Sequence, residues 1–206
     1  MKVTIIGAGN MGRGIGSRVV HGGNDVELID HNPDDARALA DDLGDGATVA
    51  DSPSGEIVVL ALPYEALPDA IEEYGDDLAG KVVVDISNPA EWSTMDRLVT
   101  PQDTSSAEET ARRVPEGTPV LKAFNTTFAG TLVAGEVAGQ DLEVLIAGDD
   151  EAAKRKLASV AEAGGLRPLD VGPLKRARQL EQVGLFHMAI QDPLGSGFGS
   201  ALRLVW

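Results

Sequence analysis

The stretch "IIGAGNMGRGIG", Ile5–Gly16, decides the fold of this chain. It continues a short apolar run that has the composition of a β-strand, and it leads into a segment compatible with a helix. The spacing Gly7-x-Gly9-x-x-Gly12 puts the first glycine in a tight turn, the second where the backbone approaches a pyrophosphate, and the third where helix and strand pack closely. The stretch therefore predicts a strand–turn–helix unit that binds a dinucleotide, with its phosphates at the positive end of the helix.

An acidic residue, Asp30, follows these glycines at about the distance at which such a fold meets the adenosine ribose. It lies in "VELIDHN", Val26–Asn32, at the end of the second apolar run. A carboxylate there accepts hydrogen bonds from the ribose hydroxyls and repels a 2′-phosphate, which favours NAD over NADP. His31 and Arg37 are close enough in sequence to approach a 2′-phosphate instead. In the alternative interpretation Asp30 is only a charge at a helix start, where Asn32 is placed to cap "NPDDARAL".

Apolar runs rich in β-branched residues recur along the chain and alternate with segments of helical spacing such as 36–43 and 153–161. This alternation predicts an α/β fold of the Rossmann type, doubly wound, with a mainly parallel sheet, helices on both faces and a short C-terminal helix and loop. The whole chain, 1–206, is expected to form one NAD(P)-binding oxidoreductase domain, and the polar region 91–117 a loop leading into a surface helix. The predicted strands are Val3–Ile6, Val26–Asp30, Ile57–Leu60, Val82–Ile86, Val120–Ala123, Leu142–Ala147 and Arg167–Asp170.

Polar or turn-forming residues follow three of these strands, at the edge where an open parallel sheet binds its ligand. Leu62 and Pro63 are placed to flank the cofactor, and Asn88 and Asn125 to hydrogen-bond the nicotinamide ribose or carboxamide. Taken singly, Asn88 reads equally well as a turn residue and Asn125 as a helix cap. The convergence of three strand ends on one crevice favours the binding site.

The composition excludes several classes of protein. No apolar run approaches the roughly 18 residues that cross a bilayer, and the first residues read as a strand rather than a signal peptide. The absence of cysteine excludes thiol chemistry, and three scattered histidines predict no metal site. A net charge of −16 opposes binding to nucleic acid and to anionic membranes. We expect a cytoplasmic protein, whose acidic, lysine-poor surface suits either a salt-rich cytoplasm or ordinary acidic solubility.

Three stretches together resemble one family of oxidoreductases: "IIGAGNMGRGIG", "KAFNTTFAG" (122–130) and "GLRPLDVGPLKRARQLE" (165–181). They are similar to the NADPH-dependent reductases of the deazaflavin coenzyme F420 and to the cytosolic reductase domain of the STEAP metalloreductases, along nearly the whole chain. The resemblance implies a single Rossmann-type domain in which hydride passes directly between nicotinamide and deazaflavin. It places Ala8, Gly9, Asn10 and Met11 in the pyrophosphate loop and Asn88 and Asn125 beside the nicotinamide.

The chain departs from this family at one position. Members that use NADPH carry a Ser-Arg pair after the second strand, where this chain has Asp30-His31. A guanidinium binds phosphate in a bidentate manner, whereas a histidine is largely neutral near pH 7. The sequence therefore predicts an enzyme that uses NADH, or one that uses NADP(H) through His31 and Arg37.

Hydride transfer between two ring systems needs little acid–base chemistry from side chains, because both cofactors carry the reactive atoms. Accordingly we predict no catalytic side chain; His187 and Lys175 are too isolated to nominate. The predicted function is hydride transfer between NAD(P)H and coenzyme F420 or a similar small-molecule acceptor. The alternatives are a flavin or ferric reductase, a hydroxyacid or imine dehydrogenase, and a dinucleotide-sensing module without turnover. The dehydrogenases rank lower because only 171–206 remain after the last predicted strand.

Two C-terminal segments complete the expectations. The segment 165–181 concentrates Arg167, Lys175, Arg176 and Arg178 in an acidic chain, either as a solvated surface or as partners of a second anionic ligand. The apolar tail "ALRLVW", 201–206, is costly to leave in water. We expect it to pack on its own domain or across a homodimer.

Overall fold

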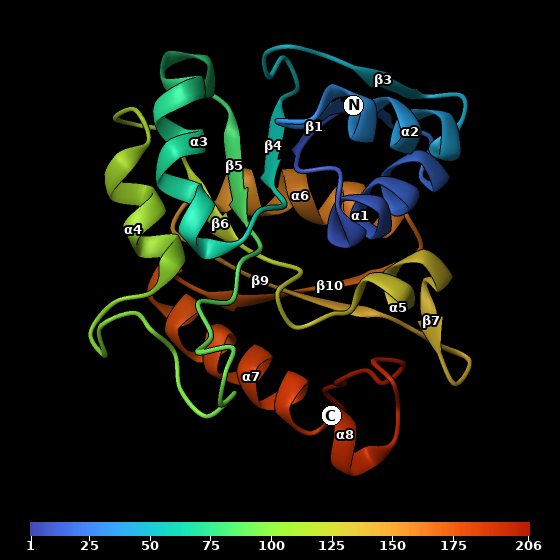
Figure 1. Ribbon diagram of the computed structural model, residues 1–206, viewed down its shortest axis with the longest axis vertical. Helices are drawn as coiled ribbons and strands as arrows, with labels where there is room; N and C mark the ends of the chain where they lie inside the picture. Colours follow the sequence, from blue (N-terminus) through green and yellow to red (C-terminus); the bar gives the residue numbers. More distant parts are fainter.

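The computed structural model describes all 206 residues, and its central element is an eight-stranded sheet (Figure 1). The strands of the chain are β1 (Lys2–Ile6), β2 (Asp25–Ile29), β3 (Ala47–Val49), β4 (Ile57–Leu60), β5 (Val82–Asp85), β6 (Val120–Lys122), β7 (Glu136–Val137), β8 (Gln140–Asp141), β9 (Glu143–Gly148) and β10 (Arg167–Gly172). The helices are α1 (Asn10–His21), α2 (Pro33–Leu43), α3 (Leu67–Tyr74), α4 (Ser106–Arg113), α5 (Ala129–Ala134), α6 (Glu151–Ala163), α7 (Ala177–Ala189) and α8 (Gln191–Leu194). Three short 3₁₀ turns, η1 (Tyr64–Ala66), η2 (Gly75–Leu78) and η3 (Leu174–Arg176), precede or follow helices.

The strand order is β10-β9-β6-β5-β4-β1-β2-β3. Strands β1 to β6 pair in parallel in the Rossmann order 3-2-1-4-5-6, so the crevice at the switch point opens between β1 and β4. Strand β9 joins β6 antiparallel, and β10 continues parallel to β9. The predicted doubly wound, mainly parallel sheet is therefore confirmed.

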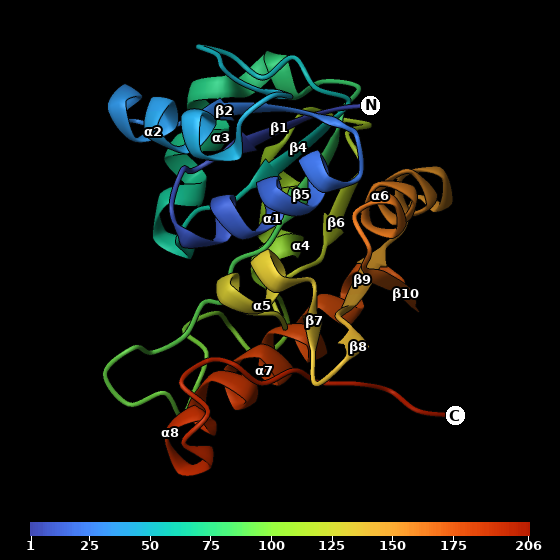
Figure 2. The ribbon, with the colours of Figure 1, turned by 90° about the vertical axis from the view of Figure 1, so that its right-hand side faces the viewer.

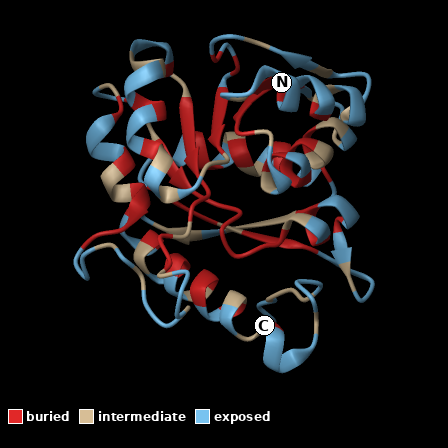
Figure 3. Ribbon diagram, in the orientation of Figure 1, coloured by how far each residue is buried: buried red, intermediate tan, exposed pale blue.

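Two apolar layers cover the sheet, because alternate residues of each strand face opposite sides. One layer contains Ile5 of β1 and Val59 of β4 with residues of α1, α2, α5 and α6. The other contains Ile6 and Leu60 of the same strands with α3, α4 and the start of α7. All residues of β4 and β5 are buried, as Figure 3 shows for the centre of the sheet. Near-continuous apolar strands thus form because both faces are covered.

The observed elements agree closely with the predicted ones. Each predicted strand is present, and the region 91–117 is a loop that leads into α4. Sequence patterns missed β3, which has only three residues, two of them exposed, and the two-residue strands β7 and β8. None of the helices has the length and apolar character of a membrane span.

The chain ends in an irregular tail that follows α8 and projects from the body of the molecule (Figure 2). Its last two residues, Val205 and Trp206, are 87% and 85% exposed. The guanidinium of Arg167 lies 4.6 Å from the centre of the Trp206 ring, which is a cation–π contact. The end of the apolar tail therefore does not pack into the core of its own chain, and the homodimer stays a prediction.

Candidate functional site

The glycine loop between β1 and α1 contains two glycines that pack against other atoms and one that faces open space. A Cβ atom on Gly7, which has φ of 111°, would overlap the carbonyl oxygen of Ala61, and one on Gly12 would overlap the carbonyl oxygen of Gly7. A Cβ on Gly9 would meet no atom within 4 Å. The first and third glycines are therefore required by the fold itself, whereas the second leaves a free backbone surface of the kind that a pyrophosphate approaches.

Helix α1 presents an uncapped N-terminus beside this surface. Its N-cap residue, Gly9, has no side chain to bond the first amides, and the first turn carries no acidic residue. Asn10 and Gly9 are exposed, and Met11 is half-buried. The free N–H groups and the positive end of the helix dipole form a site for an anion.

Asp30 links the glycine loop to the end of β2. Its Oδ2 accepts a hydrogen bond of 2.7 Å from the amide of Ala8, and its Oδ1 accepts one of 2.9 Å from the amide of Asn32. The Nδ1 atom of His31 lies 2.9 Å from Oδ1. Asn32 also caps α2 as predicted, by accepting from the amide of Asp34. Asp30 thus holds the loop in place as well as facing the predicted ribose position.

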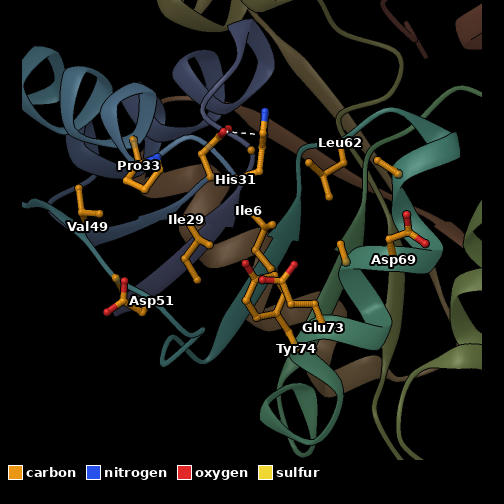
Figure 4. A pocket seen from close by; sticks show the side chains of 16 residues that line it. Ile6, Ile29, His31, Pro33, Val49, Asp51, Leu62, Asp69, Glu73 and Tyr74 are labelled. Atoms are coloured by element: carbon orange, nitrogen blue, oxygen red, sulfur yellow. Dashed lines mark ion pairs between the residues drawn. The ribbon is translucent and has the colours of Figure 1, made fainter.

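A cleft of about 480 Å³ opens beside Asp30, between the ends of β1 to β3 and helix α3 (Figure 4). Apolar side chains such as Ile6, Ile29 and Leu62 line its centre, and Tyr74 closes one side. Its ionisable lining is predominantly acidic: Asp30, Asp51, Asp69 and Glu73 accompany a single histidine, His31. The cleft therefore suits an apolar ring with hydroxyl groups better than a second phosphate.

Three residues predicted for the nucleotide site near Asp30 do not line this cleft: Asn32, which caps α2, Arg37 and Pro63. Arg37 is exposed on α2 and pairs with Asp34 at 2.6 Å, because the two side chains are neighbours one helical turn apart. Pro63 is exposed and precedes η1 instead of lining the cavity.

Asn88 and Asn125 come together at the carboxyl ends of β5 and β6. Asn88 donates from Nδ2 to the carbonyl of Asn125 at 2.8 Å, and Asn125 donates from Nδ2 to Oδ1 of Asn88 at 2.9 Å and to the carbonyl of Leu180 at 2.8 Å. Because both partners of Nδ2 are acceptors, the orientation of the Asn125 amide is set. Its Oδ1 is buried without a partner. Asn125 caps no helix, since the N-cap of α5 is Phe128.

Behind this pair lies a buried charged cluster that the sequence patterns did not reveal. Lys122, fully buried on β6, lies 3.1 Å from Oδ1 of Asp85, 2.9 Å from Oε1 of Glu181 and 2.5 Å from the carbonyl oxygen of Ser87. Ser106 of α4 donates to the second oxygen of Asp85. The only signal in the sequence was a charged residue at the end of each of two apolar strands, Asp85 in β5 and Lys122 in β6. Glu181 could not be linked to them, because it comes from a distant helix.

The two carboxyl groups of this cluster have pKa values shifted in opposite directions. Burial opposes ionisation of Asp85, but Lys122 and the hydrogen bonds from Ser106 and Ser87 outweigh it and hold its pKa below the ordinary value. Burial raises the pKa of Glu181, with the charge of Asp85 adding to the effect against the attraction of Lys122. Asp85 therefore carries the negative charge that balances Lys122, and Glu181 is the group that takes up a proton first.

Helix α7 packs across these strand ends with three residues spaced three apart. Glu181 meets Lys122, and His187 contacts the carbonyl of Thr126. Between them, Gly184 lets the helix approach closely: a Cβ there would lie 2.6 Å from Oδ1 of Asn88. These three residues bring the backbone of α7 against the pair of Asn88 and Asn125.

The basic segment 165–181 forms no common anion site. Arg167 pairs with Glu143, and Arg178 donates two hydrogen bonds, of 2.7 and 2.6 Å, to the carboxylate of Glu108. Only Lys175 and Arg176, which are exposed at η3, have no acidic partner. Most of the segment is therefore used in ion pairs within the fold.

Comparison with known proteins places the chain among oxidoreductases. A family model for coenzyme F420-dependent NADP oxidoreductases matches residues 2–89. An F420-dependent NADP reductase of Methanothermobacter thermautotrophicus is 30% identical over 201 residues, which cover 89% of this chain and 86% of that protein. The metalloreductase STEAP3 of Rattus norvegicus is 35% identical over 184 residues, 89% of this chain but only 36% of that longer protein.

A solved structure agrees over the full length. The protein comes from Arthrobacter sp. FB24 and has been provisionally assigned as an F420-dependent NADP reductase. It superimposes with a TM-score of 0.86 at 26% identity, and the match covers 100% of both chains. The glycine loop, the strand ends and the later helices are thus parts of one shared architecture.

Proposed function

The chain belongs to the family of F420-dependent NADP oxidoreductases and is an NAD(P)H-dependent oxidoreductase; from this premise we propose that it transfers a hydride between NAD(P)H and coenzyme F420 or a similar small-molecule acceptor. The observation that carries the proposal is that two places along the carboxyl edge of the sheet have polar groups without a protein partner. One is the open backbone at Gly9, and the other is the unpaired Oδ1 of Asn125. Residues 1–206 act in this proposal as one domain, because α7 packs on the strand ends that carry the site.

Each part of a dinucleotide has a partner along this edge. The free amides of Gly9, Asn10, Met11 and Gly12 hold the pyrophosphate, and the amides of Gly7 and Ala8 shape the loop through their bonds to Ile29 and Asp30. Asp30, His31 and Leu62 surround the adenosine half. Asn88 and Asn125 receive the nicotinamide end. A buried acceptor without a partner costs about 1–3 kcal/mol, so a donor such as the carboxamide N–H offsets that cost at Oδ1 of Asn125.

Bound nicotinamide supplies the hydride, and the protein positions the two rings and excludes water. Asn125 suits this role because it is buried and held from several sides. Asn125 is tied both to Asn88 and to α7. No proton transfer by a side chain is required at the reacting carbon.

The acidic cleft favours NADH over NADPH in this proposal. A 2′-phosphate beside Asp30 would face the carboxylates of Asp51, Asp69 and Glu73, and no guanidinium lines the cleft. His31 is the single basic group there, and its ring is 93% exposed. Ribose hydroxyls, by contrast, find an acceptor in Asp30.

The double variant Asp30→Ser/His31→Arg is expected to raise the NADPH-to-NADH affinity ratio at least about tenfold, because a guanidinium replaces a carboxylate beside the 2′-position. Titration of nucleotide fluorescence with both nucleotides measures the ratio. His31→Arg alone keeps the bond from Asp30 to the amide of Ala8 and should shift the ratio in the same direction, by less. Arg37→Gln is the control. A selective loss of NADPH affinity in that variant would identify Arg37 as the phosphate partner and contradict the preference for NADH.

Mixing the protein with NADH or NADPH and oxidised F420, and following the visible absorbance of the deazaflavin, tests the function directly. Bleaching supports the proposal, and the faster nucleotide is expected to be NADH. The similarity to STEAP3 favours a second candidate, reduction of a flavin or ferric chelate, which the same assay detects with those acceptors. Nucleotide binding without turnover on any acceptor would contradict both and leave a dinucleotide-sensing module.

A further inference from the structure

The ammonium group of Lys122 contacts two other segments of the chain besides its own strand. Its Nζ donates to the carbonyl oxygen of Ser87 at 2.5 Å, and it lies 3.1 Å from Oδ1 of Asp85 and 2.9 Å from Oε1 of Glu181. These contacts join β6 to the end of β5 and to helix α7. We propose that Lys122 is a positioning residue for the nicotinamide end of the dinucleotide, because it holds together the three segments that build that end of the site. The inference rests on the proposed function and adds to it a residue that is buried behind the site.

Each of the three segments leads directly to a contact of the asparagine pair, Asn88 and Asn125. Ser87 precedes Asn88, and Lys122 lies three residues before Asn125. On α7 the carbonyl of Leu180 accepts from Nδ2 of Asn125 at 2.8 Å, one residue before the carboxyl group that Lys122 contacts. The contacts of one ammonium group therefore set the spacing of the polar groups that receive the nicotinamide in the proposal.

The backbone that leads into Asn88 is held by the cluster from two sides. The amide and the hydroxyl of Ser87 both donate to Oδ1 of Asp85, at 2.8 Å, while the carbonyl of Ser87 accepts from Lys122. All the polar groups of Ser87 are thus used by the ion pair of Asp85 and Lys122. Loss of the lysine would release the carbonyl side of this arrangement, which is the side that continues into Asn88.

The turn between Lys122 and Asn125 has a strained backbone. Phe124 lies in it with φ of 61°, a left-handed conformation that bulky residues rarely adopt. Such strain persists only where the surrounding contacts determine the conformation, and it concentrates at functional sites. Lys122 anchors one end of this turn, and the hydrogen bonds of Asn125 anchor the other. The lysine therefore helps to hold a conformation that the turn would not adopt by itself.

Stability alone does not explain ionisable groups at this place. Lys122 and Asp85 are fully buried, and Glu181 is 1% exposed. Burial of an ion pair costs free energy that the attraction between the charges offsets only in part, so apolar side chains of similar volume often stabilise an interior equally well. An apolar side chain at Lys122 would, however, remove the donor to the carbonyl of Ser87 and the charged contact with α7. The cluster therefore provides fixed positions rather than a gain in stability over apolar packing.

The cluster lies apart from the residues proposed for the adenosine half. Neither Lys122 nor its two carboxyl partners line the cleft beside Asp30. The polar contacts of the cluster are with the turn after β5, with α4 and with α7. Loss of Lys122 is therefore expected to affect the nicotinamide end and to leave the adenosine end unchanged.

Lys122→Met tests this expectation with two ligands, NADH and ADP-ribose, because ADP-ribose has the same adenosine half and pyrophosphate but no nicotinamide. Calorimetric titration measures both affinities. The variant is expected to bind NADH about five- to tenfold more weakly, which corresponds to about one hydrogen bond, and to bind ADP-ribose within about twofold of the wild type. Lys156→Met removes a lysine that pairs with Glu56 on the surface, and as the matched control it should change neither affinity.

The double variant Lys122→Met/Asp85→Asn separates positioning from stability. It removes the buried charge that has lost its counter-ion, so its unfolding free energy should recover in part, but it restores no contact with Ser87 or α7. Its NADH affinity should therefore stay at least about fivefold below that of the wild type. Recovery of NADH affinity together with stability would overturn the positioning role.

Glu181→Leu is a second single variant that leaves no charge unpaired, because the ion pair of Lys122 and Asp85 remains. It breaks only the contact with α7, and we expect it to weaken NADH binding about two- to fivefold with unchanged ADP-ribose binding. If both single variants lose NADH and ADP-ribose affinity equally, or lose neither, the inference is overturned and the proposed function stands. A wild type that binds NADH no more tightly than ADP-ribose would overturn the inference together with the nicotinamide site proposed at the asparagine pair.

Discussion

Replacing Lys122 by methionine is expected to lower the free energy of unfolding by about 3–5 kcal/mol, which is the usual cost of removing one partner from a buried ion pair. Methionine fills a similar volume but leaves the carboxylate of Asp85 buried without its counter-ion. It also removes the bond to the carbonyl of Ser87, so the turn that carries Asn88 loses one of its supports. Denaturant unfolding followed by circular dichroism measures the change.

Two matched variants make this prediction specific. Lys156→Met removes a lysine that pairs with Glu56 on the surface, and it should cost no more than about 1 kcal/mol. Adding Asp85→Asn to Lys122→Met removes both charges and should recover part of the loss, because the uncompensated charge is then gone. A loss below about 1 kcal/mol in Lys122→Met would show that the cluster does not depend on its lysine.

The loss of unfolding free energy in Lys122→Met should also depend on pH. In the native protein the pKa of Asp85 is lowered, so its stabilisation is present above the pKa of the unfolded chain and is lost as the pH falls. In Lys122→Met the attraction that lowers the pKa of Asp85 is removed while its burial remains, so the folded variant binds a proton more readily than the native protein does. The difference in unfolding free energy between the two proteins therefore shrinks as the pH falls toward the carboxyl range.

Gly9→Val is expected to weaken dinucleotide binding at least about 30-fold while leaving the unfolding free energy within about 1 kcal/mol. The backbone of Gly9 is extended, with φ of −75° and ψ of −168°, and a side chain there meets no protein atom. The added bulk occupies the surface where the pyrophosphate approaches. Calorimetric titration with NADH and denaturant unfolding measure the two quantities separately.

Gly7→Ala provides the contrast. Its φ of 111° and the overlap with the carbonyl of Ala61 make any side chain strained, so we expect a loss of about 2–4 kcal/mol in unfolding free energy together with the loss of binding. If Gly9→Val binds NADH as the wild type does, the pyrophosphate does not lie against this loop.

The fold could be read from the sequence because each central strand is an apolar run bounded by turn residues, as in β4 and β5. Strand β3 could not, since three largely exposed residues carry no such pattern. At the site, the glycine loop and the convergence of Asn88 with Asn125 were predictable from strand ends. The structural bond from Asp30 to Ala8 was not, because it depends on how the ends of β1 and β2 are aligned.

The cluster around Lys122 and the contacts of His187 could not be predicted from the sequence, for a different reason. Their partners come from helices and a tail that are distant in sequence, and no local period relates Glu181 to Lys122 or Ser200 to Thr126. The sequence around a single buried histidine or lysine does not show which residues it contacts, because its neighbours are brought there by tertiary packing. Only the three-dimensional arrangement shows that His187 contacts Thr126 and Ser200.

The spacing of Glu181, Gly184 and His187 along α7 has a consequence for how relatives can diverge in length. A substitution at one of these positions disturbs the contacts of that residue alone. A one-residue insertion ahead of Glu181 rotates every later residue by about 100° and separates all three from their partners. Insertions and deletions should therefore be excluded from 177–187 in homologues that share this chemistry. They should be tolerated in the 91–105 loop. We therefore expect the length of this one helix to distinguish proteins that share the site from those that share only the fold.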